Sequence, residues 1–186
     1  MFLEHITCTL AIAILVSIYY PQIRGAYLWA FTFAGCLPDM DAIVDLVQTP
    51  LVYSAGATLP TMAEHTRVMH NIPSLFLFAM IGALILMNHK NMNYHLSAFV
   101  IGAGFGAHLL EDFLVYKPAE AILWPLSPAQ VGAGVIPWAD NIVVADSGVL
   151  IASLFLVAIA WSMKGYVRTL PRDFRCHATT TCLYLP

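Results

Sequence analysis

The sequence predicts an all-α integral membrane protein, a helical bundle of about five transmembrane helices joined by interfacial loops. The 186-residue chain is 60% hydrophobic and only 10% charged, with a mean hydropathy of +0.76, whereas soluble domains carry about 25% charged residues. Several apolar runs also approach the roughly 20 residues that a helix needs to cross a bilayer core of about 30 Å. Because no repeat or long polar linker divides the chain, we expect a single membrane-embedded domain over residues 1–186.

Two short apolar stretches come first. Residues 6–20 end at Pro21 and residues 25–37 end at Pro38, and proline stops a helix. They predict either two thin spans or a re-entrant hairpin, and we favour spans because aromatic residues suited to the membrane interface border them. These residues are Tyr19, Tyr20 and Trp29. A basic n-region and a small-residue cleavage site are both missing, so we expect residues 6–20 to be a retained helix rather than a signal peptide.

Three longer stretches follow, at residues 68–88, 93–115 and 141–163. Each is long enough to cross the bilayer core. The connecting segments 42–64 and 117–140 are rich in Pro, Gly, Ser and Thr, which is typical of ordered loops with short interfacial helices.

The charged residues divide between the two ends of such a bundle. If five helices cross the membrane, only Arg67 and Lys117 of the eight Lys and Arg residues fall on the side of the N-terminus, and only Asp173 of the eleven acidic residues falls on the other side. Basic loops stay in the cytoplasm, so residues 164–186 are expected to form a basic cytoplasmic tail, and the acidic face is expected to be extracytoplasmic. So few cations on the acidic side argue against nucleic-acid binding, which requires many phosphate contacts.

The fifteen-residue stretch GAGFGAHLLEDFLVY, residues 102–116, ends an apolar run with an imidazole and two carboxylates. His108 and Asp112 are four residues apart and share one face of a helix; both are good ligands for zinc and similar ions. Glu111 points about 100° away and is a candidate to support a ligand or to activate water. The alternative is a helix end with ordinary solvated charges.

Two other polar clusters and one histidine fall on the same side of the membrane. Asp39 and Asp41 follow a helix-stopping proline, where they suit one cation, a bridge between two cations or the cap of the next helix. His65 and His70 flank Arg67, whose planar group suits a phosphate, although a histidine at a helix start also serves as a polar cap. His5 lies at the beginning of the first helix.

Ionisable groups at membrane depth are costly and usually functional. Because four separate segments bring His or Asp to one face, we expect a metal centre on the extracytoplasmic side, within residues 1–128. The most suitable cofactor is a divalent metal, above all Zn²⁺, and so many ligands are sufficient for two or three ions. Cys8 and Cys36 lie in apolar stretches and are expected in the core.

The ordered motifs resemble those of the YdjM-type membrane-bound metal-dependent hydrolases. They are an N-terminal His, Pro-Asp-x-Asp, His-x4-His with an Arg between, and His-Leu-Leu-x-Asp followed by LWPLSP. The resemblance covers residues 1–128 and implies metal ligands at His5, Asp39, Asp41, His65, His70, His108 and Asp112. It also implies a distant kinship with zinc-dependent phospholipase C and P1-type nucleases, which hydrolyse phosphoesters. The chain departs from the family at Glu4, Thr66 and Asn71, where the family has Thr, Arg and Ser.

The expected function is therefore metal-dependent hydrolysis of a lipid-linked or membrane-proximal phosphoester. The cations would bind phosphoryl oxygens and lower the pKa of a water toward about 7, with Asp39, Asp41 or Glu111 as general base. The partner would be a membrane lipid or a lipid-linked phosphate, and the candidate substrate-binding residues are Arg67, Asn71, Lys117 and Trp124. The alternatives are a metal or proton transporter and a metal-stabilised structural protein without turnover.

Overall fold

The computed structural model describes residues 2–40, 69–89, 92–115, 121–135 and 142–169. Within these residues the chain is all-helical and has no strand, which confirms the predicted fold class. The helices are α1 (Phe2–Tyr19), α2 (Ala26–Ala34), α5 (Ile72–Met87), α6 (Tyr94–Val115) and α7 (Ile142–Thr169). The expected loop 42–64 lies outside the described residues, and residues 121–135 of the second loop form a turn followed by an irregular segment without a helix.

The helix boundaries follow local chemistry. α2 is preceded by Gly25, whose φ of +55° suits glycine, and it ends at Ala34, before Pro38. α5 begins after Asn71, whose side chain accepts a hydrogen bond from the Ser74 backbone N–H at 2.8 Å, a standard N-cap. α7 continues six residues past the expected end at 163, because Lys164 and Arg168 have long stems that can lie along apolar surface.

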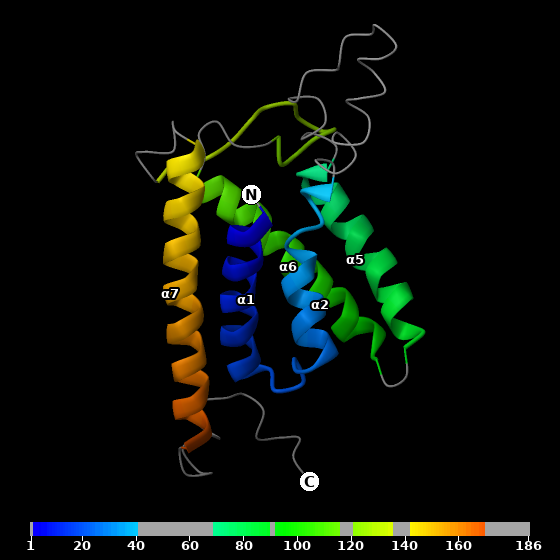
Figure 1. The fold of residues 1–186 in the computed structure, drawn as a ribbon. Coiled ribbons are helices and arrows are strands. Elements are labelled where there is room, and N and C mark those ends of the chain that lie inside the picture. The colour runs from blue at the N-terminus through cyan, green and yellow to red at the C-terminus, as the bar shows by residue number, and fades with distance from the viewer. Residues whose placement is uncertain (1, 41–68, 90–91, 116–120, 136–141, 170–186) are drawn as a thin grey trace, which may run out of the picture.

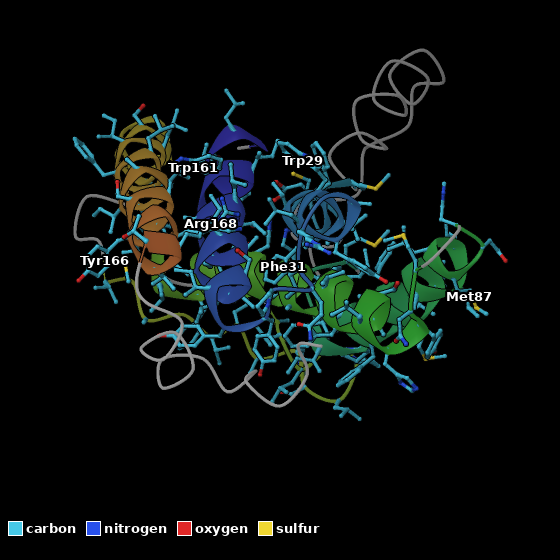
Figure 2. The ribbon with its side chains drawn as sticks, turned by 90° about the horizontal axis from the view of Figure 1, so that it is seen from below. Trp29, Phe31, Met87, Trp161, Tyr166 and Arg168 are labelled. Carbon is cyan, nitrogen blue, oxygen red and sulfur yellow. The ribbon has the colours of Figure 1, made fainter. Side chains whose placement is uncertain are left out.

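The helices alternate in direction, so that the N-terminal end of α1, the C-terminal end of α2, the start of α5 and the end of α6 all meet at the upper end in Figure 1. α6 contacts α1, α2 and α5, and α7 packs against α1. Seen along the bundle in Figure 2, Phe31 is central, whereas Met87 and Tyr166 lie at opposite edges. The first two helices are short, as predicted.

The helices pack closely where α2 crosses α6 and α1. A Cβ atom added to Gly104 would collide with the Phe31 carbonyl oxygen and come within 2.8 Å of the Ala34 Cβ. A Cβ atom added to Gly35 would collide with the hydroxyl of Thr9. These two glycines let the three backbones approach one another, and the same crossing positions the polar cluster described below.

We therefore expect Gly104→Ala to destabilise the protein, by about 1–3 kcal/mol for an overpacked core, because the backbone of Phe31 cannot move aside as a side chain can. Gly102→Ala is the matched control on the same helix, since its Cβ would meet the Ala79 Cβ at 3.5 Å and the Leu75 Cδ2 at 3.8 Å, both ordinary contacts. Thermal unfolding in detergent measures both. Equal stability of the two variants would contradict the close packing of α2 on α6.

Two helical segments, Tyr94–Val115 and Ser147–Thr169, are long and apolar enough to cross a membrane, and Leu3–Tyr19 and Ile72–Met87 are shorter apolar helices. α5 and α7 expose many large apolar side chains, among them Phe76, Phe155 and Trp161, which are 62–67% exposed. Exposing so many large apolar side chains to water is costly, and these two helix faces are suited to contact with lipid.

The described charges lie at opposite ends of the bundle. The described acidic side chains Glu4, Asp39, Glu111 and Asp112 belong to the upper end in Figure 1. Arg24, in the α1–α2 turn, and Lys164 and Arg168, near the end of α7, belong to the lower end. The described part of the chain thus has the charge separation that the sequence predicted.

Candidate metal centre

Four segments bring histidine and aspartate side chains together at the upper end of the bundle. His5 lies in the first turns of α1, Asp39 follows α2, His70 directly precedes the Asn71 cap of α5, and His108 and Asp112 share one face of α6. All five residues are less than 9% exposed.

The two carboxylates lie among the three Nε2 atoms. Asp39 lies 3.6 Å from His5 Nε2, 3.4 Å from His70 Nε2 and 3.7 Å from His108 Nε2. Asp112 lies 3.1 Å from His108 Nε2, 3.8 Å from His70 Nε2 and 3.9 Å from His5 Nε2. Three imidazole nitrogens and two carboxylates therefore surround one small volume.

The orientation of His108 is fixed by α2. Its Nδ1 lies 2.7 Å from the Gly35 carbonyl oxygen, which can only accept, so Nδ1 carries a proton, and in the neutral imidazole Nε2 presents a lone pair to a cation. A histidine ligand is typically held by such a hydrogen bond on its other nitrogen. The imidazole rings of His5 and His70 lie against it, with ring centroids 3.9 Å and 5.1 Å away.

The residues fit a divalent cation. His108 Nε2 and Asp39 Oδ2 are buried, and neither makes a hydrogen bond within the described part of the chain. Buried polar atoms are normally hydrogen-bonded, and a lone pair and a carboxylate oxygen left without a hydrogen-bond donor suit a cation. Imidazole nitrogen and carboxylate oxygen are also the ligands that zinc accepts.

The donor atoms form two overlapping triplets, His5–His108–Asp112 and Asp39–His70–His108, each with ligand atoms within 4.8 Å of one another. Both triplets need His108, whose Nδ1 is engaged by Gly35. A single Nε2 lone pair binds one ion, so the described residues best suit one central cation with both aspartates beside it. The prediction of two or three ions depends on further ligands.

Asp39 is suited to bind a cation as a carboxylate. Burial raises its pKa, but a hydrogen bond with His70 and the charges of His108, His5 and His70 outweigh this effect, so the pKa of Asp39 lies below its usual value. Cys36 behaves in the opposite way, because burial and the carboxylates of Asp39, Glu4 and Glu111 raise its pKa to about 11. The Cys36 thiol is therefore protonated at neutral pH when no metal is bound.

Glu111 approaches the cluster through His5. Its Oε2 lies 3.2 Å from His5 Nδ1, on the opposite edge of the ring from the Nε2 that faces the aspartates. Neither Glu111 oxygen makes a hydrogen bond of good geometry in the described residues, although both are buried. This arrangement orients the imidazole of His5 and increases its basicity, as a carboxylate behind a metal-binding histidine does.

We expect Glu111→Gln to weaken metal binding about 10- to 100-fold, the usual effect of removing such a supporting carboxylate. The amide keeps the size of the side chain but loses its charge. Competition with a chelator of known affinity measures the change in Kd. An unchanged Kd would show that Glu111 does not act on the metal through His5.

The remaining predicted site residues either do not face the histidine and aspartate cluster by any described contact or lie outside the described residues. Asn71 is fully buried and caps α5, and Trp124 is half-buried in the segment after α6, so a role of either in substrate binding stays a prediction. The other four predicted residues, Asp41, His65, Arg67 and Lys117, fall outside the described residues.

Sequence reasoning missed two neighbours of the cluster. Glu4 is buried beside His5 in α1, and Cys8, one helical turn after His5, approaches Glu111. The spacing His5–Cys8 was a usable signal, because residues three apart share a helix face. Cys8 and Cys36 are half-buried free thiols bordering the carboxylates, rather than purely apolar core residues.

Comparison with known proteins identifies the family of the chain. No curated protein and no solved structure matches the chain, so the kinship with phospholipase C and P1 nuclease stays a prediction. The model of one family, described as the YdjM inner membrane protein, matches residues 1–170. The helices, the apolar segments and the histidine and aspartate motifs all lie within that range, and the chain belongs to the YdjM inner membrane protein family.

Proposed function

We propose that this protein is a metal-dependent hydrolase of a lipid-linked or membrane-proximal phosphoester. The observation that carries the proposal is the convergence of three histidine Nε2 atoms and two aspartates, all buried, from four segments. A stabilising polar cluster would need fewer groups and would satisfy them with hydrogen bonds.

The chemistry divides among named residues. His5, His70, His108, Asp39 and Asp112 would hold the cation, which supplies Lewis acidity toward phosphoryl oxygens and lowers the pKa of water. Glu111 would orient His5. The sequence suggested Asp39, Asp41 or Glu111 as general base. Of the two that the structure describes, Asp39 faces the histidine Nε2 atoms and would be a ligand, whereas Glu111 does not face them and would remain available as the base. Arg67 and Lys117 remain candidates to bind the phosphate.

The depth of the cluster supports a lipid substrate. Thr7 of α1 hydrogen-bonds Ser153 of α7, and Ser17 hydrogen-bonds Lys164, so the two helices run parallel and His5 lies level with about residue 151. The described apolar segment of α7 runs from Ser147, so apolar chain extends at least four residues, or about 6 Å at 1.5 Å per residue, above the level of the cluster. A phosphoester attached to a lipid can reach that level.

The charge separation supports an orientation in which the cluster faces the extracytoplasmic side, because basic residues stay in the cytoplasm. Transport is the weaker alternative. Transporter sites lie near the midplane between two helical repeats, whereas this cluster lies at one end, and no buried ionisable residue continues it toward the lower end within the described residues.

The test is an activity screen on purified, metal-loaded protein in lipid nanodiscs. The panel contains a lipid phosphomonoester, a diacyl phosphodiester and a polyprenyl diphosphate, and the release of phosphate or of a phosphorylated headgroup is measured. We expect one class to be hydrolysed by the wild type and not by Asp112→Asn or after chelation. A metal-loaded wild type that cleaves none of them would contradict the proposal.

A further inference from the structure

We propose that residues 121–135 form a strap that lies in the interfacial layer of the membrane, over the end of the bundle that holds the metal centre, with its exposed apolar side chains in contact with lipid. The strap is a lipid-binding surface separate from the membrane-spanning helices. Its occupant is the lipid of the bilayer that surrounds the protein. The inference does not depend on catalysis.

Backbone hydrogen bonds hold the strap at both ends. The Ile72 N–H at the start of α5 donates to the Ile122 carbonyl oxygen at 2.9 Å. Near the other end, the Ala133 and Val135 N–H groups donate to the Phe113 and Leu114 carbonyl oxygens of α6 at 2.6 and 2.7 Å. The strap thus connects the helix that follows His70 with the helix end that carries Asp112, and Figure 1 shows it crossing the upper end of the bundle.

The strap lacks the charged residues that a water-exposed loop usually has. Residues 121–135 read AILWPLSPAQVGAGV and contain no Asp, Glu, Lys or Arg. Four of its large apolar side chains are exposed, and Leu126 is 88% exposed. The others are Leu123 at 50%, Val131 at 40% and Val135 at 65% exposure. Apolar side chains at an interface bind membranes in proportion to the apolar area that they bury.

The position of the strap agrees with that surface. It is bonded to the first residue of α5 and to the last turn of α6, at the upper end of the bundle in Figure 1. Backbone that is not hydrogen-bonded avoids the hydrocarbon core but is tolerated among headgroups. The exposed apolar faces of α5 and α7 below it are lipid-facing in an inner membrane protein, so the lipid-binding surface continues upward onto the strap.

The experiment measures the depth of Leu126 in a bilayer. Leu126→Cys is made in the full chain with Cys176→Ser and Cys182→Ser, labelled with a bimane fluorophore and placed in nanodiscs. Signal from the same background without the new cysteine corrects for Cys8 and Cys36. The quenchers are lipids with a doxyl group at carbon 5 or carbon 12, and aqueous iodide. Phe155→Cys on α7 is the control in lipid, and Asn88→Cys, exposed after α5 at the other end, is the control in water.

We expect the label at position 126 to lose at least half of its fluorescence with 5-doxyl lipid and less with 12-doxyl lipid, with iodide several-fold less effective than at position 88. Quenching by iodide equal to that at position 88 would place the strap in water and overturn the proposal. Protection from all three quenchers would also overturn it, because protein rather than lipid would then cover Leu126. Neither result depends on whether the protein hydrolyses a phosphoester.

Discussion

Replacing Asp39 by asparagine is expected to abolish metal binding and with it the proposed hydrolytic activity. Asp39 is the carboxylate within 3.7 Å of all three histidine Nε2 atoms, and its pKa is held below the usual value by those histidines. Asparagine has nearly the same size but offers a neutral oxygen. We expect metal affinity to fall by more than about 100-fold, beyond the loss caused by changing a supporting residue.

Elemental mass spectrometry of metal per chain measures this effect, together with lipid phosphoester hydrolysis at saturating metal. Asp173→Asn is the matched control, because it removes the same charge from the tail segment 164–186. Wild-type metal content in Asp39→Asn would exclude Asp39 as a ligand and leave the His5–His108–Asp112 triplet as the binding group. If Asp39→Asn loses its metal but the metal-loaded wild type hydrolyses no lipid phosphoester, the result would favour a structural metal site over an enzyme.

The sequence predicted the helices and the meeting of the polar clusters at one end of the bundle. Alternating spans place residues 5, 39, 70 and 108 on one side whatever the details of packing, and the four-residue spacing of His108 and Asp112 already places both on one helix face. The five helices of the described residues therefore differ from expectation mainly at their ends, as where α7 reaches Thr169.

The contacts within the site could not be predicted from the sequence. The bond between His108 Nδ1 and the Gly35 carbonyl depends on how closely α2 approaches α6, which glycine at position 104 permits. The pairing of Glu111 with His5 depends on the rotation of α1 against α6. No periodic pattern encodes either relation, because both follow from tertiary packing between segments far apart in the chain.

A His108→Ala variant is expected to lose metal binding and also to be less stable without metal. The Gly35 carbonyl oxygen accepts from His108 in a fully buried position, and an unsatisfied buried group costs about 1–3 kcal/mol, to which the cavity left by the ring adds. His95→Ala is the matched control, because His95 is an exposed histidine on the same helix, and such changes usually stay within about 0.5 kcal/mol.

Thermal unfolding in detergent with and without metal separates the two effects. In chelator, only the lost hydrogen bond and the cavity distinguish His108→Ala from the wild type. When metal is added at about 100 times its Kd, the wild type and His95→Ala should each gain about 2.7 kcal/mol, since a ligand that binds only the folded state stabilises it by mass action. His108→Ala should gain nothing. An equal gain in all three proteins would mean that the metal binds elsewhere and that His108 only packs α6 against α2.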